Sequence, residues 1–161
     1  MDSGAGGGVA IGCVRVQIRE AGITDLEAVV PLFDAYRQFY RQTTDQEGAR
    51  RFLRDRIANA ESVILLASAD SAVVGFAQMY PLFSSGAMAR IFVLNDLFVA
   101  DGWRRAGVGS TLLAAACECG RRAGAVRLTL STELTNATAQ AVYEKAGWKR
   151  DAMYCTYNMT L

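Results

Sequence analysis

The sequence predicts an α/β fold of the α+β type, in which helices flank a mixed, mostly antiparallel sheet. Three β-like segments follow one another between residues 62 and 99 with short turns between them, a pattern typical of an antiparallel meander. The third segment is followed by a glycine-rich loop, a helical pattern and a further β-like segment. That order predicts one parallel pair of strands joined by a crossover helix.

Composition fits a single globular domain. Of the 161 residues, 52% are hydrophobic and 20% are charged, and the chain is long enough to bury a full core. Residues 1–12 are rich in glycine, and their apolar part is too short for a signal sequence or a membrane span. We therefore expect a flexible tail over residues 1–12 and one domain over residues 13–161.

The residue inventory excludes several classes of function. Seventeen basic residues against sixteen acidic ones leave almost no net charge, which argues against a nucleic-acid or membrane-surface binder. The absence of histidine excludes Ser-His and Cys-His nucleophiles. The cysteines lack zinc-like spacing, so we predict no metal site and interpret them as reduced thiols of a cytoplasmic protein: Cys13, Cys117, Cys119 and Cys155.

The first elements follow from alternation and from helical spacing. Residues 14–19 alternate apolar and polar side chains as a half-buried strand does. Thr24 or Asp25 can cap a helix that continues to about residue 36, and Pro31 inside it should bend or interrupt it. A second helix is predicted over residues 45–59, and we interpret its arginines as a solvated face.

The rest of the chain contains the meander and the crossover. Strands are predicted over residues 62–67, 72–80 and 89–99, and the third is the longest and most buried. A helix is predicted from Val108 towards Arg122, with its end at Gly124. A strand over residues 126–131, a helix over 136–145 and a closing strand over 153–161 complete the sheet.

The loop between residues 100 and 110 is the first candidate for a binding site. The first turn of a helix has unpaired N–H groups and a partial positive charge, and it can hold a phosphate where side chains stand aside. Gly107 and Gly109 provide this clearance, and Arg104 and Arg105 add charge. The loop lacks the third glycine of a dinucleotide fingerprint and the Gly-Lys-Ser/Thr of a Walker loop. We interpret it as a cradle for a pyrophosphate.

The second candidate is the helix predicted over residues 136–145. Asn136 and Tyr143 are seven residues apart, or about two turns, and so share one helix face. In the simpler interpretation, Tyr143 is a core aromatic residue beside Trp148 and Asn136 is only a helix cap. The upstream loop favours the alternative, in which both side chains face a ligand held by the cradle.

The two motifs resemble those of a known family. Arg104-x-x-Gly107-x-Gly109 resembles the acetyl-CoA signature of the GCN5-related N-acetyltransferase (GNAT) family, and Asn136 through Tyr143 to Gly147 resembles its later motif. The likeness extends from about residue 14 onward. Within the family, the stretches LNDLFV and GFAQMYPLF look most like the diamine acetyltransferase branch.

The resemblance implies a sheet that splays after Val99 to bind acetyl-CoA as co-substrate. Backbone groups near the end of the third strand would pair with the pantetheine arm, the following loop would hold the pyrophosphate, and the next strand and helix would form the other wall. The implied cofactor-binding residues are Leu97, Phe98, Val99, Arg104, Arg105, Ala106, Gly107, Val108, Gly109, Ser110, Leu130, Ser131 and Asn136.

Acetyl transfer from a thioester to an amine needs a neutral amine, donors for the developing oxyanion and a proton for the departing thiolate. A Tyr of pKa about 10 can protonate a thiolate whose thiol has a pKa of about 8.5 when the site assists. Tyr143 is the expected general acid. The backbone N–H of Val99 or Phe98 is the expected oxyanion donor.

The acceptor side departs from the diamine branch. That branch tends to have Glu-Asp where this chain has Asn95-Asp96, so the carboxylate that would take the amine proton through water is absent. Neighbours on one strand face opposite ways, so Asp96 does not simply replace it. We therefore expect an acceptor other than a polyamine, such as an amino acid or a lysine-like compound. The candidate acceptor-binding residues, each also explicable as core or rim packing, are Phe39, Tyr40, Tyr80, Asn95 and Asp96.

The predicted function is acetyl-CoA-dependent N-acetylation of a primary amine of a small molecule by direct transfer. A protein lysine or N-terminal acetyltransferase is the alternative within enzymes, and a non-catalytic CoA-binding module is the alternative from another class. The predicted partners are a small-molecule amine and a second copy of the chain in a homodimer, as is common in the family. No nucleic acid and no membrane is expected as a partner.

Overall fold

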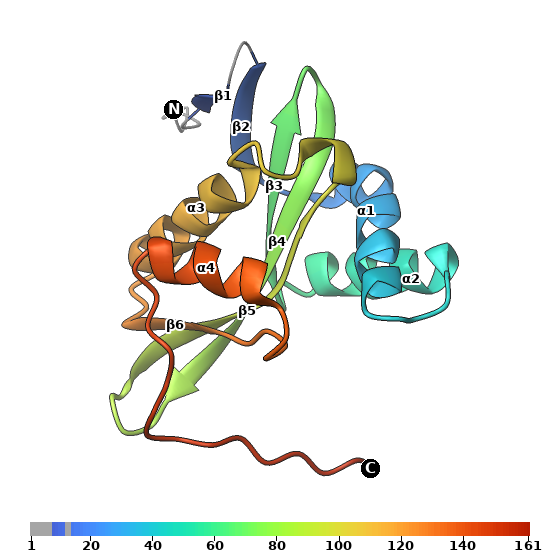
Figure 1. The fold of residues 1–161 in the computed structure, drawn as a ribbon. Helices are drawn as coiled ribbons and strands as arrows, with labels where there is room; N and C mark the ends of the chain where they lie inside the picture. The colour runs from blue at the N-terminus through green and yellow to red at the C-terminus, as the bar shows by residue number, and fades with distance from the viewer. Residues whose placement is uncertain (1–7, 12–13) are drawn as a thin grey trace, which may run out of the picture. The chain divides into compact units, whose positions relative to one another are not determined.

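The computed structural model describes residues 8–11 and 14–161 (Figure 1). The chain divides into two compact units, Met1–Ser131 and Thr132–Leu161. That residues 13–161 form one domain stays a prediction. The strands are β1 Gly8–Ile11, β2 Val14–Glu20, β3 Val63–Ala69, β4 Ala72–Ser84, β5 Ala89–Val99 and β6 Arg127–Leu130. The helices are α1 Leu26–Phe39, α2 Gln46–Ala58, α3 Val108–Arg122 and α4 Ala137–Lys145, with 3₁₀ turns at Ile23–Asp25 and Asp101–Trp103.

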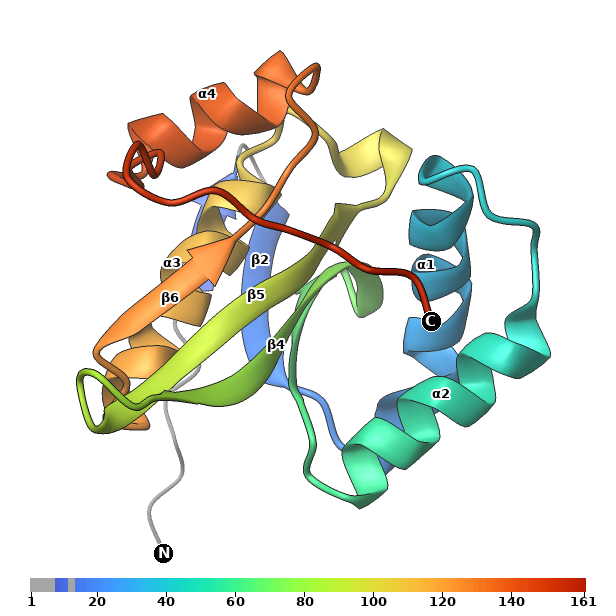
Figure 2. The ribbon, with the colours of Figure 1, turned by 90° about the horizontal axis from the view of Figure 1, so that it is seen from below.

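The first unit contains the sheet, in the order β1-β2-β3-β4-β5-β6. Neighbours from β1 to β5 are antiparallel, and β5 and β6 are parallel. The predicted mixed, mostly antiparallel sheet with one crossover through α3 is therefore confirmed. Figure 2 shows β4, β5 and β6 side by side, with α3 on one side of the sheet and α1 and α2 on the other.

The main core lies between the sheet and the pair α1 and α2. Leu53 of α2 and Phe76 of β4 are fully buried there. The rings of Phe33 and Tyr36 from α1 lie with their centroids 6.0 Å from that of Phe76. On the other face, Leu112 and Leu113 of α3 are buried against the sheet. Apolar burial of this size stabilises a side chain by about 1.5 to 3 kcal/mol, so both helix layers are fixed to the strands that carry the site.

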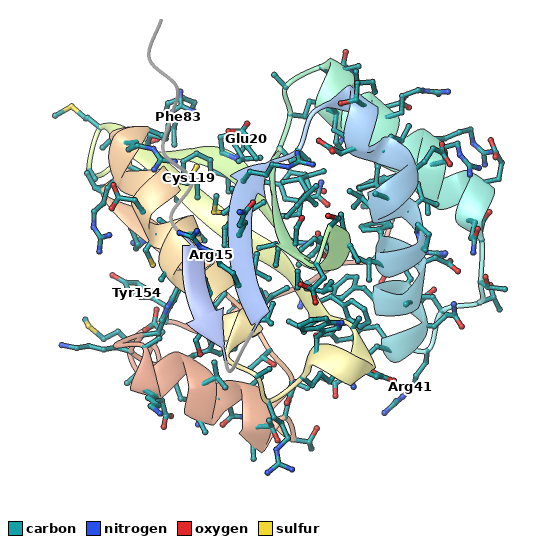
Figure 3. The ribbon with its side chains drawn as sticks, turned by 90° about the horizontal axis from the view of Figure 1, so that it is seen from above. Arg15, Glu20, Arg41, Phe83, Cys119 and Tyr154 are labelled. Carbon is teal, nitrogen blue, oxygen red and sulfur yellow. The ribbon has the colours of Figure 1, made fainter. Side chains whose placement is uncertain are left out.

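Cys119 of α3 is 8% exposed and lies on the side of the helix that faces β2 (Figure 3). Burial, with a contribution from the charge of Glu20, raises the pKa of its thiol. This fits the predicted role of a protonated thiol in the core. Among the described residues, no three His, Cys, Asp or Glu side chains are grouped as metal ligands, and no helix has the length and apolar content of a membrane span.

Three predicted features differ from the structure. Gly8–Ile11 pairs with β2, so part of the expected tail is a strand; residues 1–7 and 12, and Cys13, lie outside the described residues. The apolar residues after Gly8 pair as a hairpin strand despite the glycine content around them. Of the two predicted effects of Pro31, a bend or an interruption, the interruption is absent: helix α1 continues through Pro31, because proline removes only the one hydrogen bond that an N–H there would have donated to Glu27. Residues 153–161 form no strand, although a closing strand was predicted there. Alternating apolar and polar residues identify a segment that could join a sheet, but they do not show that a partner strand is available.

Candidate cofactor and acceptor site

The loop after β5 leads into helix α3, whose N-terminus has no side-chain cap. Gly107 is the N-cap residue of α3 and has φ 81°, a left-handed conformation that explains the glycine. Arg105 also has a positive φ, 62°, which costs about 1 kcal/mol or more for a residue with a side chain. No side chain caps the helix, and its first turn carries no acidic residue. The N–H groups at this end are therefore suited to an external anion.

The backbone conformation that requires a glycine at position 107 does not apply at position 109. A Cβ at position 109 would lie 3.9 Å from Cγ2 of Val99, an ordinary contact. The fold therefore does not require a glycine there, and the missing side chain leaves the first turn of α3 accessible. The backbone conformation explains the glycine at position 107, whereas nothing in the fold requires the glycine at position 109.

Arg104 holds the loop in place. Its Nε donates to the carbonyl oxygen of Val99 at 3.1 Å, and its guanidinium forms an ion pair with Asp101 at 2.8 Å. The guanidinium also lies over the rings of Phe39 and Phe98, at 5.8 and 5.5 Å. The Arg104 side chain, predicted to add charge for the cofactor, is thus already engaged, although it is partly exposed, and Arg105 beside it is also exposed.

The edge of β5 opens earlier than predicted. Parallel pairing with β6 runs from Ile91↔Arg127 to Leu94↔Leu130, where β6 ends. Residues 95–99 continue beside β4 but have no strand of the described sheet on their other edge. The separation predicted after Val99 therefore begins after Leu94.

The register shows which backbone groups of β5 face this open edge. The N–H of Ala100 donates to the carbonyl of Val74 at 2.9 Å, which makes Val99↔Gly75 a non-hydrogen-bonded pair. By alternation, Phe98 exchanges its hydrogen bonds with β4, whereas the N–H and C=O groups of Leu97 and Val99 point to the open edge. Because the N–H of Phe98 is engaged, of the two expected oxyanion donors only that of Val99 faces this edge.

A β-bulge lies at the start of the open edge. Leu94 pairs with Met79 and Asp96 pairs with Gln78, so Asn95 is an extra residue in β5. Simple alternation predicted that Asn95 and Asp96 would face opposite ways. In the structure Asn95 is exposed and Asp96 is buried, and at the bulge Nδ2 of Asn95 donates to Oδ1 of Asp96 at 3.0 Å.

Asp96 is 5% exposed. Burial raises the pKa of its carboxyl group, although hydrogen bonds from the side chains of Tyr36 and Asn95 act in the opposite direction. The hydroxyl of Tyr36 is also 3.4 Å from the carbonyl oxygen of Asn95, so α1 is tied to the bulge. Burial and the nearby charge of Asp96 raise the pKa of Tyr80 to about 12, against an opposing effect of Arg56. A buried carboxyl group between two tyrosines is a candidate for proton transfer.

The structure brings the acceptor candidates together only in part. Asn95 and Asp96 are hydrogen-bonded at the bulge, and Tyr80 lies near enough for the charge of Asp96 to affect its pKa. The ring of Tyr40 packs against those of Tyr36 and Phe39, with centroids 5.1 and 5.2 Å apart. Phe39 lines a separate hollow of about 480 Å³. The residues that line it are Leu32, Ala35, Gln38, Phe39, Phe98, Ala100, Asp101 and Arg104.

Sequence reasoning missed Tyr36 and Gln78. Tyr36 fits the apolar period of α1, which concealed its hydroxyl contacts. Gln78 is fully buried, and its Nε2 donates to Oγ of Ser62 at 2.8 Å. An amide inside the apolar stretch AVVGFAQMYPLF was the available signal, since buried polar side chains need partners.

The second unit carries the later motif. Asn136 is the N-cap of α4, and its Oδ1 accepts the N–H of Ala139 at 3.1 Å, so the simpler interpretation as a cap holds for that atom. The ring of Tyr143 lies 6.4 Å from that of Trp148. Of the remaining predicted residues, Leu130 ends β6 and Ser131 is the last residue of the first unit.

Known proteins resemble this chain over most of its length. The model of the acetyltransferase (GNAT) family matches residues 29–148, which span parts of both units. An uncharacterized N-acetyltransferase of Bacillus subtilis, YhfO, is 46% identical over 142 residues, which cover 88% of this chain and 95% of the relative. An aminoglycoside N(6')-acetyltransferase type 1 of Klebsiella aerogenes is 27% identical over 105 residues, or 64% of this chain and 69% of the relative.

Solved structures give the same result. The crystal structure of a probable acetyltransferase has a TM-score of 0.86 and 40% identity, and it covers 89% of this chain and 97% of its own. The aminoglycoside N-acetyltransferase AAC(6')-Iy in complex with CoA has a TM-score of 0.78 with 19% identity, over 95% of this chain and 100% of its own. At that identity, the second likeness shows the fold alone.

Proposed function

Because the chain belongs to the acetyltransferase (GNAT) family, we propose that it transfers an acetyl group directly from acetyl-CoA to a primary amine of a small molecule. The observation that carries the proposal is the uncapped N-terminus of α3 directly after the open edge of β5. The amides of a helix N-terminus fit a diphosphate, and an open strand edge fits an extended chain that contains amides. Both are features of coenzyme A.

The proposed binding mode assigns a task to each part of the loop. Arg105, Ala106, Gly107 and the first turn of α3 hold the diphosphate through backbone N–H groups, and Arg105 adds charge. At the strand edge, Leu97 offers both its N–H and its C=O to the pantetheine arm. The carbonyl of Val99 accepts from Arg104, so its N–H is the group left to meet the developing oxyanion. The further residues proposed to bind the cofactor are Leu130, Ser131 and Asn136.

Tyr143 is the proposed general acid. When the amine attacks the thioester carbonyl, the thiolate of coenzyme A leaves and takes the phenolic proton of Tyr143. A phenol of pKa about 10 transfers this proton to a thiolate whose thiol has a pKa of about 8.5 only when hydrogen bonds in the site stabilise the phenolate. Tyr143 therefore acts on the rate of turnover rather than on cofactor affinity.

The acceptor is proposed to be an amine other than a polyamine. LNDLFV and GFAQMYPLF resemble the diamine acetyltransferase branch, but Asn95 supplies no carboxylate to attract a polycation. The aminoglycoside N(6')-acetyltransferase among the relatives is named for a small amine substrate, which supports a small-molecule acceptor. We include a homodimer and a cytoplasmic location in the proposal, to be tested by light scattering and by cell fractionation.

The experiment has two stages. Isothermal titration with acetyl-CoA is expected to give a dissociation constant in the micromolar range, and an assay of released thiol over a panel of amino acids, lysine-like amines, aminoglycosides and polyamines is expected to identify the acceptor. No binding of acetyl-CoA would refute the proposal. Binding without turnover on any amine would favour a CoA-binding module, and turnover on protein lysines or N-termini alone would favour a protein acetyltransferase.

A further inference from the structure

We propose that Asp96 is the base that takes the proton of the acceptor's ammonium group, and that Gln78 is the positioning residue that holds this proton on the carboxyl group. This assignment rests on the proposed function, and it identifies the general base, which could not be identified from the sequence. The two buried polar side chains lie opposite each other on β4 and β5.

Gln78 and Asp96 form a cross-strand pair. Directly opposed residues of antiparallel strands project to the same face of the sheet, with Cβ atoms about 5 Å apart. Gln78 is 0% exposed and Asp96 is 5% exposed, so the two side chains share a site from which water is nearly excluded. Two polar side chains opposed in this way lie within reach of a hydrogen bond to each other.

Only one end of the Gln78 amide has a partner. Its Nε2 donates to Ser62, whereas its Oε1 is buried and meets no hydrogen-bond donor among the described residues. An ionised Asp96 has no proton to donate to Oε1. A protonated Asp96 has one O–H, and this bond would complete the hydrogen bonding of Gln78. The orphaned oxygen therefore favours the protonated carboxyl group.

The other contacts of Asp96 favour the ionised form. Tyr36 from α1 and the amide of Asn95 both donate to its carboxylate, whereas burial raises its pKa. Among the described residues, Tyr80 of β4 is a further titratable group near Asp96, and its pKa is also influenced by Arg56 and Glu61. The donors Tyr36 and Asn95 thus favour the ionised carboxylate, and the acceptor Oε1 of Gln78 favours the protonated carboxyl group. A general base must be able to adopt both forms.

Asp34 shows that burial alone does not produce this arrangement. It is 2% exposed, but its carboxylate accepts hydrogen bonds from the backbone N–H of Asp45 and from the side chains of Thr44, Gln38 and Arg37. Although burial opposes ionisation, these donors lower its pKa. Asp34 is thus a fully partnered carboxylate, whereas Asp96 has an unpartnered acceptor beside it.

The proton moves from the ammonium group of the acceptor to the carboxylate of Asp96. The acceptor's N–H bond breaks, its electron pair stays on nitrogen, and the proton forms an O–H bond on Asp96 that points to Oε1 of Gln78. The neutral amine then attacks the thioester carbonyl at the open edge of β5. As the thiolate leaves with the phenolic proton of Tyr143, the second N–H bond of the nitrogen breaks and its proton returns to the phenolate of Tyr143. After turnover, the proton leaves Asp96 for water.

Carbon NMR of protein with ¹³C-labelled aspartate tests the carboxyl group without turnover. The midpoint of Asp96, assigned with Asp96→Asn, is expected well above the ordinary value of about 3.9, with that of Asp34 below it as an internal control. Gln78→Met is expected to lower the midpoint of Asp96, and Tyr36→Phe is expected to raise it. An Asp96 midpoint at or below the ordinary value, or a rise in Gln78→Met, would overturn the proposal; a rise would mean that the amide of Gln78 donates to the carboxylate.

Kinetics test the role as a base. Asp96→Asn is expected to lower kcat/KM about a hundredfold or more while it retains affinity for acetyl-CoA. The acid limb of the pH profile is expected to move to lower pH in Gln78→Met and to higher pH in Tyr36→Phe, two variants that remain informative if Asp96→Asn does not fold. Glu118→Gln, on the exposed face of α3, is the control and should leave the profile unchanged.

The outcomes separate the two proposals. Wild-type protein that acetylates no amine refutes the proposed function, and the base role with it. Wild-type turnover together with an undiminished rate in Asp96→Asn refutes the base role alone. Acid limbs that do not move in Gln78→Met and Tyr36→Phe also refute it.

Discussion

Ser110→Glu is expected to leave the fold at least as stable and to weaken the binding of acetyl-CoA. Ser110 is exposed at the third position of α3, in a first turn that carries no acid and no side-chain cap. A negative charge there interacts favourably with the helix dipole, by about 0.3 to 1 kcal/mol. For a chain of this size, that is a rise in Tm of about 1 to 4 °C.

The same charge opposes a bound diphosphate. At about 6 Å in water, two unit charges repel each other by about 0.7 kcal/mol, so a diphosphate with about two charges is repelled by about 1.4 kcal/mol. This is about a tenfold loss of affinity, and it grows where the effective dielectric constant is lower. The result would separate stability from binding, since the two change in opposite directions.

Ser110→Gln is the matched control because it has nearly the size of Glu and no charge. Isothermal titration with acetyl-CoA and thermal unfolding of the free proteins measure the two effects. The difference in affinity between the Glu and Gln variants should narrow at high salt, where exposed charges are screened. Equal affinities of the two variants at low salt would refute the placement of the diphosphate at this helix end.

Three further predictions follow from other residues. Tyr143→Phe is expected to lower kcat about a hundredfold with little change in acetyl-CoA affinity, as measured by steady-state kinetics and titration, and a wild-type kcat would remove Tyr143 from the mechanism. Gly107→Ala and Gly124→Ala, both at positive φ (81° and 70°), should each cost about 1 kcal/mol in thermal unfolding, but only the first should weaken acetyl-CoA binding. Hydrogen bonding to Arg19 holds the pKa of Asp25 at about 2, below the ordinary 3.8. The stability advantage of wild type over Asp25→Asn should therefore be full above about pH 4 and be lost as pH falls towards 2; urea unfolding that showed the same advantage at pH 2 would contradict it.

The local sequence pattern was sufficient to predict most of the helices and strands. The limits of β5 and α3 agree with those predicted, because a buried strand, two glycines and a helical apolar stripe all mark the same boundary. Asp70 and Ser71, where a tight turn was expected, have φ of 47° and 67° and join β3 to β4. These strand, helix and turn boundaries are determined by residues close together in the chain, which is why they could be predicted from the sequence.

The features that determine the site depend on contacts between distant residues. The bulge at Asn95 exists only in the register between β4 and β5, so the sequence alone could not show the hydrogen bond between Asn95 and Asp96. The engagement of Arg104 requires Phe39 of α1, and the unpartnered Oε1 of Gln78 requires the full set of its neighbours. The early opening of the sheet follows from the end of β6 at Leu130, more than 30 residues beyond β5. Sequence pattern contains none of these pairings.

A crystal structure with coenzyme A bound tests the central claim most directly. The account predicts diphosphate oxygens within hydrogen-bond distance of the backbone N–H groups of Gly109 and Ser110, and an amide of the pantetheine arm paired with Leu97 on the open edge of β5. Coenzyme A bound elsewhere, with this helix end and strand edge free of it, would contradict the account.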